Sequence, residues 1–302
     1  MLFRSAALLL GLTANGVDLT TSVAAAVIAL IPVLSVSSGL VNFAMSMLIP
    51  PKLLPKLDFA PGIPADQQSI VVVPMLLSST EDIAEDLATL EQNYLGNSDS
   101  QLRFALLSDF VDAKSAEMPD DQRLLDQAIA GIDHLNNRYA VNGAGSFYLF
   151  HRRRLWNDVA QQWMGWERKR GKLEEFNELL RGADDTSFVL QHGYKPAAIR
   201  HTRYAITLDA DSYMPTGTAA RLVGAMAHPL NCARFDESSD RVVGGYTVIQ
   251  PRLETNPVTG ADTYFARIFA GDVMLDLYTN AVSNVYQDLF GDAVFEIGRA
   301  HV

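Results

Sequence analysis

The sequence predicts an α/β fold with a mostly parallel sheet, preceded by transmembrane or interfacial helices. Two observations predict this arrangement. From Ile70 onward, short apolar segments rich in β-branched residues alternate with longer amphipathic segments, as in domains whose helices pack on a parallel sheet. Before them, the stretch from Leu19 to Pro51 carries no charged residue and exceeds the roughly 20 apolar residues that cross a bilayer.

The uncharged stretch is expected to form two helices. Pro32 and the serines from Ser35 to Ser38 are predicted to divide it. Thr20 to Leu34 would then span the bilayer, and Leu40 to Ile49 would form an interfacial helix. The alternatives are a secretory signal peptide over Met1 to Leu12 and a buried core helix.

A basic, proline-rich linker follows the apolar stretch. Lys52 and Lys56 place the next domain on the cytoplasmic side of the membrane, because positive residues flank membrane segments on that side. Prolines mark the boundary between the membrane part and the folded domain. They are Pro50, Pro51, Pro55, Pro61 and Pro64.

The first strand and the first helix of the folded domain carry clear local signals. Ile70 to Val73 is a β-branched apolar run that stops at Pro74, which is typical of a buried parallel strand. Ser79 then provides an N-cap ahead of acidic residues, so a helix is predicted to about Tyr94.

The same alternation continues along the chain. Ligands of parallel sheets bind at the carboxyl ends of the strands. Asp109 and Asp209 each follow a predicted strand, so we expect them to face one site. Strands are predicted over Arg103–Ser108, Ser146–Phe150, Tyr204–Leu208 and Val242–Gln250. Helices are predicted over Asp120–Asn136, Lys172–Leu180, Thr216–Ala227 and Thr263–Phe290, the last with a break near Gly271.

The segment Asp209-Ala210-Asp211 is the first candidate for chemistry. Carboxylates two residues apart at a strand end can both reach one hard cation such as Mg²⁺. A metal there would bridge a diphosphate and offset the charge on a departing nucleoside diphosphate. A solvated acidic turn is the competing interpretation.

Two further features fit a nucleotide site. Asp109 can accept hydrogen bonds from a uracil ring or a ribose, or it can cap a turn. The basic segment from Trp166 to Lys172 precedes a helix, where cations and free N–H groups together attract phosphate. The alternative interpretation of this basic segment is a solvated helix start.

Trp163 and Trp166 flank Gly165 and suit either a sugar platform or core packing. The basic run from His151 to Arg154 is expected to be an exposed loop, and the alternative is that it adds to the positive field of the Trp166–Lys172 segment.

Composition limits the function classes. The net charge of −11 and the pI of about 4.9 argue against a general nucleic-acid binder. The single Cys232 cannot form an internal disulfide or a cysteine metal cage. The sequence has no nucleophile elbow, phosphate-binding Gly-Lys-Ser/Thr loop or zinc signature.

Taken together, these segments resemble the glycosyltransferase domain of cyclic β-1,2-glucan synthases. The resemblance covers about residues 50 to 294. The stretches that carry it are Pro51 to Phe59, Val71 to Pro74, Leu102 to Phe110, Trp163 to Asn177, Ile206 to Asp211 and Ser283 to Gly291.

The resemblance implies a GT-A fold, a UDP-glucose donor, a Mg²⁺ or Mn²⁺ ion and a β-1,2-glucan product made at the bacterial inner membrane. Asp109 would hold the uridine, and Lys172 with Asn177 would face the nucleotide phosphates or ribose. Asp209 and Asp211 would hold the metal and the diphosphate. An α-linked donor that gives a β-linked product requires inversion, with an acceptor hydroxyl as nucleophile and a base for its proton.

The resemblance also implies missing parts. The catalytic base and the acceptor-site residues are expected beyond residue 295, with further membrane helices and glycan-processing domains of the same polypeptide. Residues 296–302 look like the translation of a sequencing adapter. We therefore predict membrane segments and linker at 1–57, a truncated glycosyltransferase domain at 58–295 and a non-native tail at 296–302.

The expected activity is that of a hexosyltransferase. The chain is expected to be its donor-binding fragment, which can bind a nucleotide sugar without catalysing transfer. Its expected partners are a nucleotide sugar, a glucan acceptor and membrane lipid, with no nucleic acid. The alternatives are a synthase of linear osmoregulated periplasmic glucans and a non-catalytic membrane scaffold.

Overall fold

The computed structural model of the protein describes residues 16, 18–48, 54–140, 145–193, 199, 201–236, 238 and 241–251. These residues fall into two compact units, which are treated separately. One unit contains helix α2 (Leu19–Leu48), and the other spans Pro55–Ile249.

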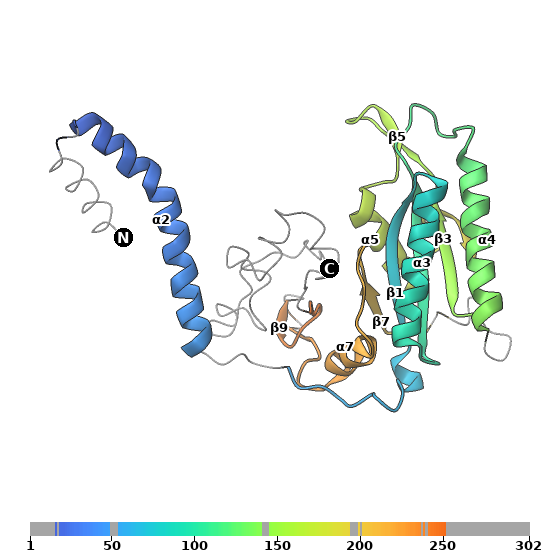
Figure 1. The fold of residues 1–302 in the computed structure, drawn as a ribbon. Helices are drawn as coiled ribbons and strands as arrows, with labels where there is room; N and C mark the ends of the chain where they lie inside the picture. Colours follow the sequence, from blue (N-terminus) through green and yellow to red (C-terminus); the bar gives the residue numbers. More distant parts are fainter. Residues whose placement is uncertain are drawn as a thin grey trace. The chain divides into compact units, whose positions relative to one another are not determined.

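Helix α2 is one continuous helix of 30 residues, drawn in blue in Figure 1. The predicted division at Pro32 is therefore wrong. A proline removes one backbone N–H donor, and its ring clashes with the preceding turn of the helix. In a long helix the result can be a bend rather than a break. Asp18 precedes the helix and accepts hydrogen bonds from the backbone N–H and hydroxyl of Thr21. Among the described parts of the chain, no helix combines the length and apolarity that a bilayer crossing requires, so the predicted span over Thr20–Leu34 is not confirmed.

In its described residues, the second unit is built on a five-stranded, mostly parallel sheet, and a mostly parallel sheet was predicted (Figure 1). The strand order is β6-β3-β2-β1-β7, and of these five strands only β6 runs antiparallel to its neighbour. The fold is that of a Rossmann-like α/β domain. The strands are β1 (Ser69–Leu77), β2 (Leu102–Phe110), β3 (Phe147–Arg152), β6 (Phe188–His192) and β7 (Tyr204–Thr207).

Helices cover both faces of this sheet. Successive side chains of each strand point to opposite faces, so each strand contributes to two hydrophobic cores, one on each face. Val71 and Val73 of β1 join the core under α3 (Thr80–Asn97), α4 (Asp121–Tyr139) and α7 (Thr218–Ala227). Ile70 and Val72 join the opposite core, which Phe176 of α5 (Arg168–Leu180) fills. All four strand residues are fully buried, which explains why β1 reads as a continuous apolar run.

The strand order creates a crevice beside β1. The chain proceeds from β1 to β2 to β3 in one direction and later returns to place β7 on the other side of β1. At such a switch point the loops after neighbouring strands diverge, and ligands bind there. The fold therefore positions a site at the carboxyl end of β1.

Strand β1 continues through Pro74 to Leu77, whereas the sequence predicted that it would stop at Pro74. The carbonyl of Val72 accepts a hydrogen bond from Leu208, so the backbone groups of residue 74 also point toward the β7 side. Pairing with β7 ends at Val72. Among the described strands none pairs with Pro74 on that side, so its missing N–H leaves no described hydrogen bond unmade.

Two asparagines of α3 hold the segment that follows β7. Asn93 donates to the carbonyl of Ser212 (3.1 Å) and accepts from the backbone N–H of Met214 (2.7 Å). Asn97 donates to the carbonyl of Met214 and accepts from the N–H of Ala219. Both side chains are buried, and together they fix the path of the chain between β7 and α7.

The smaller elements depart from the prediction. The strand expected over Val242–Gln250 is only β9 (Val242–Gly244), and it pairs antiparallel with β8 (Arg234–Phe235) outside the main sheet. A hairpin of β4 (Leu155–Asn157) and β5 (Gln162–Met164) and the short 3-10 helix η1 (Ala65–Gln67) were not predicted. The helix predicted over Thr263–Phe290 lies outside the described residues.

Asn93→Ala is expected to lower the free energy of unfolding by about 1–3 kcal/mol, because it leaves buried backbone groups of Ser212 and Met214 without side-chain partners. Urea denaturation followed by circular dichroism measures the change. Gln92→Ala is the matched control, since it removes an exposed amide from the adjacent position of the same helix. Equal losses from both substitutions would contradict the prediction.

Candidate functional site

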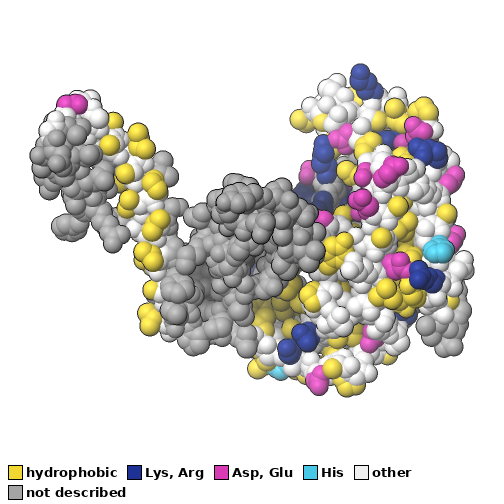
Figure 2. Space-filling model, viewed as in Figure 1, with side chains coloured by type: hydrophobic (Ala, Val, Ile, Leu, Met, Phe, Trp, Pro, Cys, Tyr) yellow, Lys and Arg dark blue, Asp and Glu magenta, His cyan; other side chains and the backbone are white. Residues whose placement is uncertain are grey.

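A cleft of about 390 Å³ opens at the carboxyl ends of β1 and β2, between α3 and α5. It lies at the switch point of the sheet, where the fold predicts a ligand site. Figure 2 shows acidic and basic side chains side by side at the upper end of this unit. The cleft is lined by Pro74, Met75, Leu76, Ser78, Asp82, Asp86, Asp109, Phe110, Asp112, Gly165, Arg168, Lys169, Lys172 and Ala210.

Cations from α5 form one side of the cleft. Arg168 binds the carboxylate of Asp112 at 2.5 Å, and Lys169 forms an ion pair with Asp209. Both cations remain more than half exposed. Since exposed ion pairs contribute little to stability, these cations can exchange partners readily. The rim of the cleft is therefore suited to an anionic ligand.

Carboxylates from α3 form the opposite side. Burial raises the pKa of Asp86 to about 6, and the negative charges of Asp82 and Glu85 act in the same direction. Lys172 opposes this shift. Asp86 is thus a carboxyl group that titrates near neutral pH inside a charged cleft.

Asp109 and Lys172 form the floor of the cleft and belong to a network of four buried charges, whose other members, Arg152 and Glu175, lie beneath the lining. Arg152 is fully buried and binds Asp109 through two hydrogen bonds, of 2.8 Å from Nε and 2.9 Å from Nη2. Its Nη1 donates to Glu175 at 3.1 Å. The Lys172 ammonium lies 3.1 Å from Asp109 and donates to the carbonyl of Met75 at 2.6 Å. Two cations and two carboxylates balance, so no net charge is buried.

This network joins four elements to one another. Asp109 belongs to β2, Arg152 to β3, Lys172 and Glu175 to α5, and the Met75 carbonyl to β1. Arg152 also donates to the carbonyls of Trp166 and Arg168, which begin the α5 segment. Burial lowers the pKa of Lys172, while the adjacent Asp109 carboxylate opposes that shift. The ammonium is therefore held at the floor by a specific carboxylate.

The basic run from His151 to Arg154 is not the exposed loop that the sequence predicted. Arg152 is fully buried in β3, and Arg154 is 4% exposed and binds Asp121 through both ends of its guanidinium. Buried cations are tolerated when each is paired and hydrogen-bonded. The loop prediction failed because the partner carboxylates lie far away in the sequence.

His151 lies beside this network on the other face of the sheet. Its Nδ1 is 2.9 Å from the Ser108 hydroxyl, and its buried Nε2 has no hydrogen-bond partner among the residues that the structure describes. Burial lowers the pKa of His151 to about 4, and the nearby Asp109 carboxylate only partly offsets that effect. The imidazole is therefore neutral at physiological pH.

The structure brings some of the predicted site residues together. Asp109 and Lys172 contact each other in the cleft. Asp209 and Asp211 lie exposed in the turn after β7, and Asp209 reaches the cleft rim through Lys169. Asn177 is exposed further along α5 and does not line the cleft.

A divalent ion fits the chemistry of this rim only if a bound ligand supplies part of its coordination. Within the described ranges, no three His, Cys, Asp or Glu side chains lie close enough to hold a metal. Asp209 and Asp211 can supply hard oxygen atoms, and Mg²⁺ commonly takes one or two carboxylates with substrate phosphates and water. Metal binding at Asp209 would require its ion pair with Lys169 to open.

Several residues of the site escaped the sequence analysis. Arg152 and Glu175 support Asp109 from beneath the cleft, and Asp82 and Asp86 line the acidic side. The spacing of Asp82 and Asp86 by four helical residues was a readable signal that they share one face of α3. Gly165 is also required, since a Cβ there would lie 2.6 Å from the Asp109 carboxylate.

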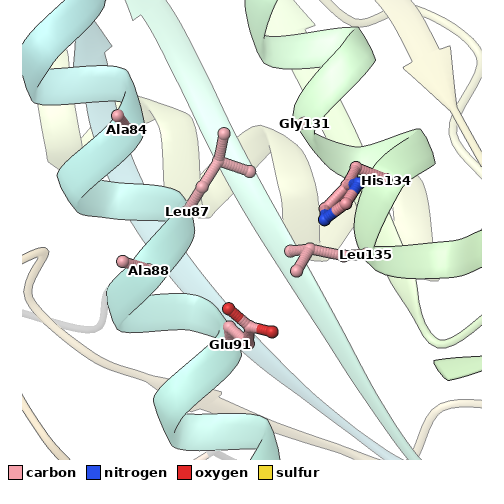
Figure 3. A pocket seen from close by; sticks show the side chains of 7 residues that line it. All are labelled: Ala84, Leu87, Ala88, Glu91, Gly131, His134 and Leu135. Atoms are coloured by element: carbon pink, nitrogen blue, oxygen red, sulfur yellow. The ribbon is translucent and has the colours of Figure 1, made fainter. Parts of the chain in front are cut away.

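A second depression, between α3 and α4, is a weaker candidate (Figure 3). It measures about 230 Å³ and is lined mainly by apolar or small residues, with Glu91 and His134 at its edge. It lies against the helices rather than at the strand ends. Gly131 lets Leu87 approach closely there, which indicates helix packing rather than ligand binding.

Comparison with known proteins supports a glucan synthase relationship. The chain is 41% identical over 258 residues to the cyclic β-(1,2)-glucan synthase NdvB of Rhizobium meliloti (strain 1021). The match covers 85% of this chain and 9% of that relative. No family model matches the chain.

Arg152→Met is expected to lower the free energy of unfolding by about 3–5 kcal/mol, because it leaves Asp109 and Glu175 buried without their shared cation. Chemical denaturation measures the loss. Arg153→Met serves as the control, since the neighbouring Arg153 side chain is exposed. A loss from Arg152→Met no larger than that from Arg153→Met would show that the network is not a stabilising floor.

The neutral His151 predicts a pH dependence of stability. Between its ordinary pKa of 6.5 and its folded pKa of about 4, the unfolded chain binds a proton that the folded chain does not. The free energy of unfolding should fall as the pH falls through this window, by about 2–3 kcal/mol, since one pKa unit is worth about 1.4 kcal/mol. Asp86 acts in the opposite direction, because its raised pKa favours the folded state as the pH falls.

Comparing His151→Asn with the unsubstituted protein isolates the histidine, since Asp86 is present in both. Unfolding at pH 7.5 and pH 4.5 should show a smaller pH dependence in His151→Asn, with His134→Asn as an exposed-histidine control. The same pH dependence in all three proteins would refute the assignment.

Proposed function

The chain belongs to the cyclic β-(1,2)-glucan synthase family, and from that membership we propose that it is the donor-binding part of a membrane-associated, inverting glucosyltransferase. Its donor would be UDP-glucose and its product β-1,2-glucan. The chain spans 9% of the relative's length, so these activities are proposed for the site and not for the whole protein. The observation that carries the proposal is the charged cleft at the switch point of the sheet.

The cleft offers complementary groups for a sugar nucleotide in a GT-A-type fold. Asp109 lies at the floor, and each carboxylate oxygen has two lone pairs, so Oδ1 can accept from a uracil N–H beside its bond from Arg152. Arg168 and Lys169 stand at the rim, where a diphosphate can replace their present carboxylate partners. The floor would recognise the uridine and the rim would hold the phosphates.

Asn177 contributes less directly to this proposal. It lies on the α5 helix that carries Lys172, but it is exposed and outside the cleft lining. We therefore assign the phosphate or ribose contact expected of Asn177 to Arg168 and Lys169 instead. Lys172, with its ammonium held by Asp109 and the Met75 carbonyl, supplies positive potential from below.

Asp209 and Asp211 are proposed to hold a Mg²⁺ or Mn²⁺ ion together with the donor diphosphate. Such an ion would stabilise the negative charge that develops on the departing UDP. The chain's own contribution is a partner exchange. If Asp209 held the metal, its ion pair with Lys169 would open and Lys169 would be free to meet a phosphate oxygen.

Association with the bacterial inner membrane is proposed for helix α2, with the cleft-bearing unit on the cytoplasmic side. The helix contains no acidic or basic residue. Several of its large apolar side chains are exposed, among them Val27 at 62%, Ile28 at 72% and Leu48 at 76%. Exposed apolar side chains of this extent favour a lipid or protein contact.

The chain is expected to bind UDP in the presence of Mn²⁺ or Mg²⁺, and Asp209→Ala should weaken that binding at least tenfold, or by about 1.4 kcal/mol. Titration calorimetry of the full chain, with and without EDTA, measures the effect. Asp185→Ala is the matched control, because Asp185 is an exposed carboxylate beyond the opposite end of α5. UDP affinity that is unaffected by EDTA and by Asp209→Ala would exclude the metal site. A folded chain that binds no UDP would favour the scaffold alternative.

A further inference from the structure

The hairpin of β4 and β5 projects from the upper end of its unit in Figure 1 and presents two different faces. Leu155 pairs with Met164 on the inner face, where Met164 is only 6% exposed. Trp156 pairs with Trp163 on the outer face, because neighbouring residues of a strand point to opposite sides. Trp156 is 44% exposed. Core packing therefore does not account for this tryptophan.

The indole of Trp156 is held in a defined orientation. Its Nε1 donates to Asp158 at 2.8 Å, and its ring meets that of Trp163 edge to face, with centroids 5.8 Å apart. Asn157 fixes the turn by accepting from the N–H groups of Val159 and Ala160. A preorganised aromatic ring loses little conformational entropy on binding a ligand. An exposed ring that is fixed in this way is suited to recognition.

The polar side chains around the two tryptophans indicate the chemistry of the ligand. Between Leu155 and Met164, Asn157 holds the turn and Gln162 binds Asp112, which leaves the Gln161 amide and the Asp158 carboxylate for a ligand. This segment has no lysine or arginine. Amides both donate and accept hydrogen bonds, as sugar hydroxyls do, and the C–H face of a pyranose packs on an indole. An anionic membrane surface would instead attract cations, which this hairpin lacks.

The hairpin is joined directly to the rim of the cleft. Trp163 exchanges two backbone hydrogen bonds with Ala113, of 2.8 and 2.9 Å. The side chain of Gln162 donates to Asp112, which lines the cleft and binds Arg168. Gly165, immediately after β5, is also part of the cleft lining. The hairpin that carries Trp156 is therefore anchored to the rim of the cleft through its inner face and the edge of β5.

We propose that the outer face of this hairpin, centred on Trp156, is a binding platform for the glucan chain that the neighbouring site extends. The pyranose rings stack on Trp156, while Asp158 and Gln161, both exposed, contact the sugar hydroxyls. The platform rests on the proposed function, since it assigns the substrate class of the same site. It supplies a carbohydrate contact outside the nucleotide cleft.

The test uses the full chain and β-1,2-linked glucose oligosaccharides of defined length, followed by titration calorimetry and tryptophan fluorescence. Trp156→Ala should weaken oligosaccharide binding at least tenfold and leave UDP affinity in Mn²⁺ unchanged. Trp156→Phe, which keeps an aromatic face, should retain most of the binding. Phe235→Ala is the control, because Phe235 is an aromatic residue of β8 with a similar exposure of 48%.

The outcomes separate the platform from the donor site. Oligosaccharide binding that is absent, or equal in the unsubstituted and Trp156→Ala proteins, while UDP still binds, overturns the platform and leaves the proposed function intact. Oligosaccharide binding that depends on Trp156, in a chain that does not bind UDP, supports the platform and contradicts the proposed donor site. Loss of binding to phosphatidylglycerol vesicles in Trp156→Ala, with oligosaccharide binding unchanged, shows that Trp156 contacts lipid instead and overturns the proposal.

Discussion

The buried contact between Arg152 and Asp109 is the interaction on which the site depends. Both side chains are almost completely removed from water, at 0% and 3% side-chain exposure, which costs several kcal/mol for each ion. The cost is offset because the guanidinium binds the carboxylate through two hydrogen bonds and also reaches Glu175 and two backbone carbonyls. Such a pair tolerates little movement, so it fixes the register between β2, β3 and α5.

That rigidity separates the floor of the cleft from its rim. At the floor, Lys172 is held by Asp109 and the Met75 carbonyl and has no freedom to follow a ligand. At the rim, Lys169 and Asp209 form a contact in which both side chains are more than half exposed. A fixed floor can define where a ligand lies, and exchangeable rim pairs can adapt to its charge. This division suits the proposed function, in which the site would bind and release a sugar nucleotide in each cycle.

The sequence allowed the layered fold and part of the site to be predicted because those features have local signals. Apolar runs marked β1, β2 and β3, and the strand-end rule predicted a ligand site at Asp109, which in the structure contacts Lys172 of α5. The role of Arg152 had no local signal, because its partners lie 43 and 23 residues away in the chain. A run of four consecutive basic residues normally indicates solvent exposure, and only the fold shows where the matching carboxylates lie.

Asp112 links the two parts of the proposed glucan-extending site. Its carboxylate binds Arg168, one of the two rim cations, and also accepts from Gln162 of the hairpin. A diphosphate that draws Arg168 away would leave Gln162 as the remaining partner of Asp112 among these contacts. Asp112 pairs with Arg168, which faces the proposed donor, and it also anchors the hairpin through Gln162. Donor binding and the position of Trp156 therefore both depend on Asp112. The physical basis for such coupling is a chain of direct contacts from Arg168 through Asp112 to Gln162, adjacent in sequence to Trp163.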